Sequence, residues 1–396
     1  MAPEQQQNAL PAKSAFRYRL TSRSVLLQLI MALGVALFFY FILTNTLHNL
    51  EQRGIKTGFG FLSTESGFGI VQTLVEYDET HTFGRTFLVG LLNTLLVSAL
   101  GIIFASIIGF IIGVARLSGN WLVAKLAAIY IETFRNIPLL LQILFWYFAV
   151  LQPLPMPRRS LRIGEYIFLN NRGLYLPSPV FGKGFWLVMV AVAVSVVAVI
   201  FLKRWAHYRQ EQTGEKFMAI YAAIAIPLLL PLFVFLTSGS PLSWDLPDLK
   251  GFNFRGGITV IPELAALLTA LSIYTAAFIA EIVRSGIMSV SRGQTEAAYA
   301  LGLRPGITMR LVVVPQAMRV IIPQLTSQFL NLTKNSSLAT AVGYPDLVAV
   351  FAGTTLNQTG QAVEVIAMTM AVYLLLSLLI SILMNRYNKK IQLVET

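Results

Sequence analysis

The chain has 396 residues, of which 56% are hydrophobic and only 12% charged, and its mean hydropathy is +0.68. Ordinary soluble domains carry about 25% charged residues, so this composition excludes a soluble globular protein and predicts an integral membrane protein. The chain has no cysteine and three scattered histidines, which excludes disulfides and Cys-ligated metal sites and disfavours a histidine metal cluster. The net charge of +12 is spread over the ends of apolar runs, which argues against a nucleic-acid-binding face.

Long apolar runs recur along the chain, and a helix needs about 20 such residues to cross a bilayer. They predict an all-α membrane protein with about eight transmembrane helices, at residues 25–44, 86–115, 124–151, 185–202, 217–237, 260–283, 319–334 and 363–385. The run at 319–334 is short, and the apolar stretch 338–352 is a candidate broken continuation of it. The first run lacks a small-residue cleavage site, so it predicts a retained helix rather than a signal peptide.

These runs divide the chain into six regions. We expect an N-terminal tail (1–24), a first helix with an external loop (25–85), a first core part (86–152), an inserted region of two helices with external loops (153–259), a second core part (260–386) and a C-terminal tail (387–396). The inserted connections at 153–184 and 238–259 are rich in Pro, Gly and aromatic residues, which predicts some structure of their own.

The distribution of basic residues assigns the two sides of the membrane. Eight crossings place on one side the two tails, the Arg116–Lys125 turn, the Lys203–Lys216 loop and a polar connection at 285–318. Because these segments are basic, the positive-inside rule makes that side cytoplasmic. The loop at 153–184 is also basic yet falls on the other side. We interpret it as an ordered external segment whose charges do not set the orientation; the alternative is a helix count that is wrong by one nearby.

The second apolar run contains small residues at every fourth position: Gly101, Ala105, Gly109 and Gly113. Such a ridge lets helix backbones approach closely in lipid. Packing within the chain is the favoured interpretation, and an interface between subunits is the alternative. Just upstream, Asn93 belongs to a polar pair inside an apolar helix.

Two charged pairs lie near predicted helix ends. Glu132 and Arg135 are three residues apart, as are Glu281 and Arg284, so each pair shares a helix face and is able to form an ion pair. Pro138 interrupts the third helix and frees backbone carbonyls that could face a cavity. Ionisable groups in a membrane are costly and mark functional sites. A structural brace near the cytoplasmic boundary is an equally good interpretation.

A polar break, Lys334 followed by Asn335, ends the seventh apolar run. It either lines a pathway or is a plain helix terminus at the outer interface. The candidate pathway or gate residues are therefore Asn93, Glu132, Arg135, Asn136, Glu281, Arg284, Lys334 and Asn335.

The connection at 285–318 predicts two short helices. Ser291 with Gln294 three residues on has the spacing of a capping box, and Gly302 is a natural left-handed stop for the helix formers that precede it. Pro305 suits the first turn of a second helix. Helices this short are unstable alone in water, so the element is expected to be held by a partner.

Within this connection, Glu296-Ala297-Ala298 is followed by Gly302 after three residues and by Pro315 at the far end. The pattern resembles the EAA loop of ABC-importer permeases, in which Ile and Leu stand where this chain has Val312 and Val314. In that family the loop docks into a groove on the ATPase. The resemblance implies six ATPase-coupling residues: Gly293, Glu296, Ala297, Ala298, Gly302 and Pro315.

Three further stretches, at 90–95, 134–142 and 334–338, are similar to the polar-amino-acid branch of these permeases. The extra first helix and the region 153–259 resemble the long subunit of general L-amino-acid or glutamate/glutamine/aspartate importers. This likeness implies a type I importer in a bacterial inner membrane, with alternating access and both termini cytoplasmic. It also implies a homologous second permease, an ATPase dimer that carries ATP and Mg, a periplasmic amino-acid-binding protein, and no cofactor in this chain.

Several alternatives remain open from the sequence. The chain contains no Gly-x4-Gly-Lys-Ser/Thr motif, so ATP hydrolysis is expected in another chain. An ion-coupled secondary transporter would need acids near the midplane, whereas Glu132 and Glu281 lie near the cytoplasmic face. A permease for another solute, such as an opine or a compatible solute, would share the loop, whereas a non-transporting scaffold would have no use for it. The favoured function is ATP-driven transport of polar L-amino acids, acidic ones and their amides included.

Overall fold

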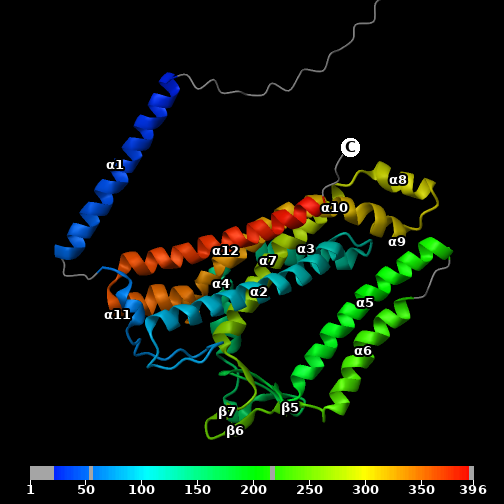
Figure 1. Ribbon diagram of the computed structural model, residues 1–396, viewed down its shortest axis with the longest axis horizontal. Helices are drawn as coiled ribbons and strands as arrows, with labels where there is room; N and C mark the ends of the chain where they lie inside the picture. The colour runs from blue at the N-terminus through cyan, green and yellow to red at the C-terminus, as the bar shows by residue number, and fades with distance from the viewer. Residues whose placement is uncertain (1–21, 53–56, 215–218, 392–396) are drawn as a thin grey trace, which may run out of the picture.

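Figure 1 shows the computed structural model, which describes residues 22–52, 57–214 and 219–391. Its long helices are α1 (Ser22–Gln52), α2 (Phe83–Arg116), α5 (Phe185–Thr213), α6 (Ala219–Thr237), α7 (Pro262–Met288), α10 (Val314–Asn335) and α12 (Ala362–Ile391). Among the described residues, seven helical segments are long and apolar enough to span a membrane, or eight with one bent pair. The predicted membrane fold of about eight helices is confirmed. The predicted N-terminal tail, 1–24, lies mostly outside the described residues, whereas the first half of the predicted C-terminal tail, 387–391, belongs to α12.

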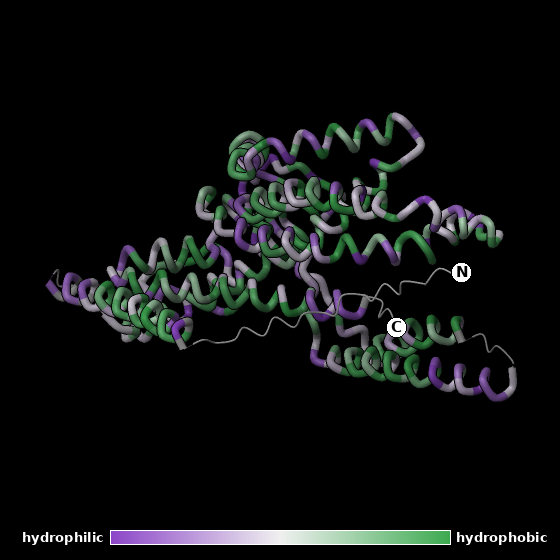
Figure 2. The backbone as a smooth tube through the Cα atoms, turned by 90° about the horizontal axis from the view of Figure 1, so that it is seen from above, coloured by the Kyte–Doolittle hydropathy of each residue, from purple (hydrophilic) through white to green (hydrophobic). Residues whose placement is uncertain are grey.

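Shorter helical segments connect the long ones. They are η1 (Phe59–Ser63), α3 (Trp121–Asn136), α4 (Leu139–Leu144), η2 (Phe145–Leu151), η3 (Pro157–Arg159), α8 (Arg292–Ala300), α9 (Pro305–Thr308), η4 (Met309–Val313), η5 (Ser336–Val342), η6 (Val348–Thr355) and α11 (Leu356–Thr359). Hydrophobic residues predominate along most of the helical tube, with hydrophilic ones interspersed and frequent at turns and ends (Figure 2).

Two helices extend beyond the apolar runs that predict them. α5 continues to Thr213, through most of the stretch expected to be the Lys203–Lys216 loop. Its Lys, Arg, Gln and Glu residues there are good helix formers, so the helix persists after its apolar run ends. Likewise, α9, η4, α10 and η5 form one segment, Pro305–Val342. The expected second arm is therefore continuous with the seventh span, and the π-helical turn η4 lies just before Pro315.

α7 is the most buried span, and it packs against α2, α3, α4 and α10. The small-residue ridge of α2 packs within the chain, as expected, with Gly109 and Gly113 against α7 and Gly101 against Leu332 of α10. A Cβ atom on Gly109 would lie 2.6 Å from the side chain of Ile279, and one on Gly113 would lie 2.7 Å from the carbonyl oxygen of Ala280. The two helix backbones approach too closely at these positions for any larger residue.

The helix break at Pro138 bends the α3–α4 pair by 105°. The side-chain nitrogen of Gln142 donates hydrogen bonds to the carbonyl oxygens of Phe134 at 3.0 Å and Ile137 at 2.9 Å. The expectation that the freed carbonyls face a cavity is therefore wrong for these two. A buried amide satisfies them because unpaired carbonyls are costly in lipid.

The inserted connections fold into a small β unit at one end of the bundle. Its strands are β1 (Leu161–Ile163), β2 (Ile167–Asn170), β3 (Gly173–Leu176), β4 (Ser178–Phe181), β5 (Leu242–Asp245), β6 (Asp248–Lys250), β7 (Asn253–Arg255) and β8 (Ile258–Val260). A four-stranded antiparallel sheet has the order β1-β2-β3-β8, and β4–β5 and β6–β7 form two ribbons. Phe254 stacks on Phe168 with 4.5 Å between ring centroids and forms part of the core of this unit. The connections thus have structure of their own, as expected.

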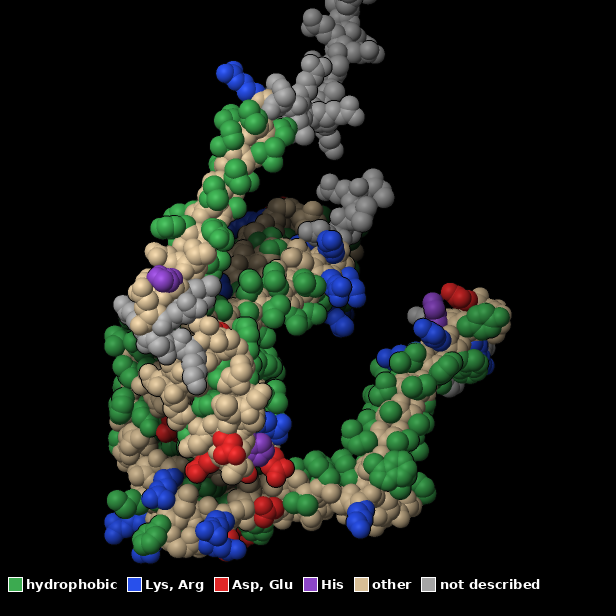
Figure 3. Space-filling view, turned by 60° about the vertical axis from the view of Figure 1, so that its left-hand side comes forward, with side chains coloured by type: hydrophobic (Ala, Val, Ile, Leu, Met, Phe, Trp, Pro, Cys, Tyr) green, Lys and Arg blue, Asp and Glu red, His purple; other side chains and the backbone are tan. Residues whose placement is uncertain are grey.

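The α5–α6 hairpin stands away from the bundle on the β unit (Figure 3). Its long helices pack mainly on each other, and hydrophobic side chains cover its visible face. α1 likewise exposes most of its apolar residues. Helices with apolar residues on all sides are typical of segments that face lipid or another membrane subunit.

Candidate functional site

The polar element at 291–315 begins with α8, which ends at a left-handed glycine. Gly302 has φ +76°, and its N–H donates to the carbonyl oxygen of Tyr299 at 2.9 Å. The next N–H, of Leu303, donates to the carbonyl oxygen of Ala298 at 3.1 Å. These two bonds form a Schellman motif, which ends the helix sharply. The predicted stop at Gly302 and the helix start at Pro305 are both confirmed.

The predicted capping box does not form at the start of α8. Ser291 occupies the N-cap position, but its side chain accepts no capping hydrogen bond. The side chain of Gln294 instead meets that of Gln316 on α10, with 3.4 Å between Oε1 and Nε2. This contact and the buried Ala298 hold α8 against the start of α10.

One face of this element is exposed and has an unusual composition for a polar turn. Gly293, Glu296 and Ala297 are exposed, as are Gly302 and Pro315. Around them lie exposed apolar side chains: Tyr299, Leu301 (81% exposed), Ile307, Met309 and Leu311. Five of the six predicted coupling residues are therefore exposed within the same element as these apolar side chains, while Ala298 is buried. Such a mixture is typical of a contact surface for another protein.

A polar cavity of about 350 Å³ lies between α3, α7 and α10. Arg135 and Glu281 both line it, so the structure brings together two of the predicted pathway residues. The Arg135 guanidinium carbon lies 5.1 Å from the centroid of the Phe278 ring, in a cation–π contact. Opposite charges and an aromatic ring therefore surround a space within the helical bundle.

Of the two predicted ion pairs, only one is present in the described part of the chain. Arg284 donates to both carboxylate oxygens of Glu281, at 2.9 Å from Nε and 2.6 Å from Nη2. The pairing of Glu132 with Arg135 was a wrong expectation, because Arg135 lies over Phe278 and Glu132 is exposed. Asn136 is exposed as well, beside the Pro138 break.

Asn93 forms a buried brace. Its side-chain nitrogen donates to the carbonyl oxygens of Gln72 at 2.9 Å and Pro345 at 2.8 Å. The neighbouring hydroxyl of Thr94 accepts a hydrogen bond from the N–H of Leu347 at 3.0 Å. These bonds tie α2 to the segment between η5 and η6, so the geometry favours a structural role for Asn93 over a gating role.

Lys334 and Asn335 lie away from that brace, at the end of α10. Lys334 lines a second cavity of about 500 Å³ between α10, α12 and η6, together with Tyr373 and several hydroxyl side chains. This position favours the pathway interpretation of Lys334 over that of a plain helix terminus. The cavity beside Lys334 is nevertheless separate from the cavity beside Arg135.

Three polar residues that the sequence did not single out also line the Arg135 cavity. Gln324, Ser327 and Gln328 are spaced by three and four residues on α10. Such spacing places them on one helix face, and this signal was present in the sequence. Their amides and hydroxyl add neutral hydrogen-bonding groups to the charged wall opposite.

Asp346 was also missed, a single acid in the apolar stretch 338–352. It is 1% exposed, and its Oδ1 accepts a hydrogen bond from the N–H of Ala349 at 2.8 Å. The hydroxyl of Tyr373 lies 3.4 Å from its other oxygen. Asp346 therefore caps the start of η6 and is fully enclosed. The stretch itself is broken at Gly343, where φ is +77°.

The fold and the site together define a polytopic membrane protein with a polar cavity between three of its helices and an exposed, partly apolar element at 291–315, as in a transport permease. A sequence model of binding-protein-dependent transport system inner membrane components matches residues 216–393. The chain is 56% identical to the ABC transporter permease protein YhdX of Escherichia coli (strain K12), with 95% of each chain covered. It thus belongs to the family of ABC transporter permeases.

Two further relatives match over nearly the whole chain. The general L-amino acid transport system permease protein AapQ of Rhizobium johnstonii is 52% identical, with 94% of this chain and 93% of that protein covered. The glutamate/glutamine/aspartate/asparagine transport system permease protein BztB of Rhodobacter capsulatus is 45% identical, with 97% and 98% covered. The predicted family and long-subunit type are confirmed, and the chain is an inner membrane component of an ABC transport system.

Proposed function

We propose that this chain is the permease subunit of an ATP-driven importer for polar L-amino acids, acidic ones and their amides included. The substrate class is supported by similarity over nearly the full length to two relatives. The name of one specifies general L-amino acids, and that of the other specifies glutamate, glutamine, aspartate and asparagine. The inserted β unit and the α5–α6 hairpin lie within the aligned length, so the likeness extends beyond the helical core.

The exposed surface around α8 and α9 is the proposed contact with the ATPase. Its geometry supports this role, because a short helix fixed at Gly302 and joined rigidly to α10 through η4 transmits a displacement directly into a membrane span. ATP and Mg bind in that partner. A homologous second permease completes the translocation unit, and α1 and the α5–α6 hairpin offer apolar faces to it or to lipid.

The end of the bundle that carries α8 faces the cytoplasm in this proposal, together with both chain termini. The basic residues of the last turn of α12, Lys389 and Lys390, support this orientation by the positive-inside rule. The β unit then lies on the periplasmic side, where an amino-acid-binding protein would dock. Binding of ATP would draw α8 of this chain and the matching helix of the second permease together and open the cavity outward. Hydrolysis of ATP would then return the cavity to its inward-open state.

The Arg135 cavity is the proposed part of the pathway. We expect Arg135→Ala to lower the maximal rate of uptake about tenfold, because Arg135 supplies the only basic group among the described residues that line the cavity. Arg135→Lys should restore part of the rate, since it keeps the charge without the flat contact on Phe278. Uptake kinetics of the assembled complex would measure both.

Lys125→Ala is the matched control, a basic residue that is exposed on the same helix and outside the cavity. Equal uptake kinetics for Arg135→Ala and the wild type would show that Arg135 has no role in transport.

Copurification tests the proposed assembly. The tagged chain, expressed with its genomic neighbours and extracted in mild detergent, is expected to bring with it an ATPase and a second permease. A chain that remains alone even after mild crosslinking would contradict the assembly and favour a secondary transporter.

A further inference from the structure

A polar cavity of about 580 Å³, here called the mouth cavity, lies where the β unit meets the helical bundle. It is lined by residues 71–73, the end of η2, the turn between β2 and β3, strands β3, β7 and β8, and the start of α7. Its volume falls within the range of small-molecule sites, about 300–1,000 Å³. The mouth cavity is distinct from the Arg135 cavity, with which it shares no residue.

The lining carries one positive and one negative group. Arg172 supplies the guanidinium and Glu263 the carboxylate, and amide side chains, Gln152 and Asn253 among them, complete the wall. Among the described residues, neither charged group has a salt-bridge partner within 4.0 Å. Two charges of opposite sign therefore face one polar space without neutralising each other directly.

The fold holds both groups in place. The N–H of Arg172 donates to the side-chain oxygen of Asn170 at 2.8 Å, which fixes the tight turn between β2 and β3. Gly173 closes this turn with φ +133° and packs against the carbonyl of Val260, where no Cβ would fit. The hydroxyl of Tyr147 donates to Oε1 of Glu263 at 2.9 Å and holds this carboxylate in the lining of the cavity.

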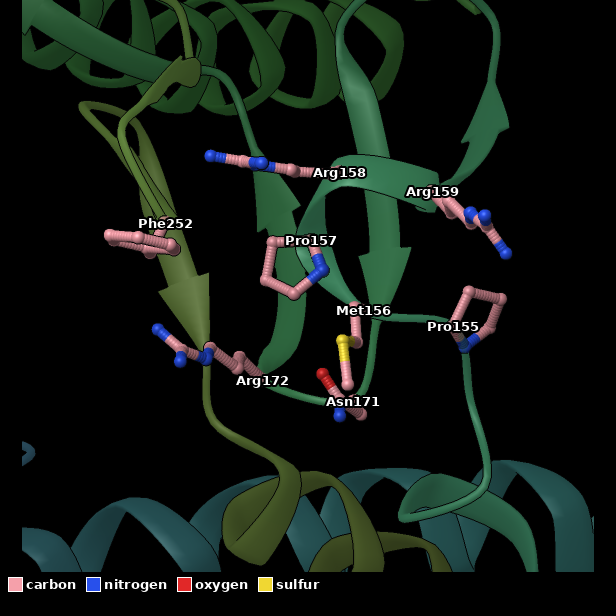
Figure 4. A pocket seen from close by; sticks show the side chains of 8 residues that line it. All are labelled: Pro155, Met156, Pro157, Arg158, Arg159, Asn171, Arg172 and Phe252. Carbon is pink, nitrogen blue, oxygen red and sulfur yellow. The ribbon is translucent and has the colours of Figure 1, made fainter.

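Arg172 also borders a neighbouring hollow of about 850 Å³ on the β unit (Figure 4). Figure 4 shows Arg172 and Asn171 at the end of that hollow near the helices, with Phe252 and Arg158 farther along it. The two spaces share Asn171 and Arg172, so Arg172 stands at the passage from the β unit to the bundle.

We propose that the mouth cavity is a transient binding site for a zwitterionic amino acid, with Arg172 receiving the α-carboxylate and Glu263 the α-ammonium. This inference rests on the proposed function. An amino acid has both charges on one carbon, whereas a simple carboxylate or amine would leave Glu263 or Arg172 unmatched. Because a planar guanidinium binds a carboxylate in a bidentate manner, Arg172 suits the acid group. Arg172 is exposed, so water competes for its guanidinium and the site binds its ligand weakly.

Photocrosslinking of the purified complex tests this site directly, with L-photo-leucine as the probe. We expect the label on peptides that contain residues 71–73 or 259–263. Excess L-glutamine should remove it, whereas propionate and propylamine, each with one of the two charges, should not. Arg172→Ala and Glu263→Gln should each lower the labelling about tenfold. Absent labelling, or labelling that propionate removes equally well, would overturn the proposal.

Uptake into proteoliposomes separates this proposal from its alternatives. At saturating loaded binding protein, Arg172→Ala should lower the maximal rate about tenfold and leave the concentration of binding protein at half-maximal rate unchanged. Arg159→Ala is the matched control, because Arg159 lines only the neighbouring hollow. If both variants raise the concentration of binding protein at half-maximal rate, the arginines dock the binding protein. The proposed amino-acid site in the mouth cavity is then wrong. If the wild-type complex transports no amino acid, the proposed function is wrong, and the mouth site, which rests on it, is wrong as well.

Discussion

Gly302→Pro is expected to abolish ATP-driven uptake while the chain still inserts into the membrane. Gly302 has φ +76°, whereas proline is fixed near −65°, so the Schellman motif at the end of α8 cannot form. The N–H that bonds to Tyr299 is lost as well. The bundle does not depend on this turn, because Gly302 is exposed and a side chain there would meet nothing within 4 Å. The loss should therefore be in coupling rather than in folding.

The effect is measured as uptake and as ATP hydrolysis by the assembled complex, with the amount of inserted chain as the reference. Gly302→Ala should retain partial activity, since a left-handed alanine costs only about 1–2 kcal/mol. Gly306→Ala is the matched control, a glycine with free space in the same element and no positive φ. Normal uptake by Gly302→Pro would remove the coupling role from this turn.

Gly109→Val is expected to have the largest effect on stability. A Cβ at this position would lie 2.6 Å from the Ile279 side chain and 3.0 Å from the carbonyl oxygen of Ala276. Since real contacts at these distances do not occur, α2 and α7 must separate, and α7 is the most buried span. Overpacking of this kind costs about 3 kcal/mol, and separation of two packed helices extends the damage beyond one site.

The thermal unfolding midpoint and the yield of monodisperse protein in detergent measure this loss. Gly34→Val serves as the control, because Gly34 lies in α1 with nothing within 4 Å of an added Cβ. Both variants add the same apolar volume to an apolar helix, so a difference between them isolates the α2–α7 contact. Equal stability of the two would contradict the observed packing.

The sequence predicted the helices well because an apolar run of sufficient length has few alternatives in a membrane. It also located the turn at Gly302, where the backbone conformation itself requires glycine. The ends of helices were harder to place. The charged residues after position 202 end the apolar run of α5 but not its hydrogen bonding, so hydropathy alone set the boundary too early.

Side-chain partners were the least predictable part of the site. Glu132 and Arg135 share a helix face, yet Arg135 forms a cation–π contact with Phe278 on another helix instead. Gln142 and Asp346 each satisfy backbone groups at helix breaks, and although Pro138 predicts its break, the local sequence does not show which side chain satisfies the freed groups. Such contacts depend on which helices become neighbours, and spacing along one helix carries no information about that.

Hydrolysis-driven transport by the reconstituted complex is the most direct test of the central claim. Proteoliposomes would contain this chain with its copurified permease and ATPase, and receive binding protein loaded with radiolabelled L-glutamine. We expect accumulation only with ATP and Mg present, and ATP hydrolysis stimulated by the loaded binding protein. Accumulation that follows an imposed proton or sodium gradient without ATP would contradict the assignment of this chain to an ATP-driven importer.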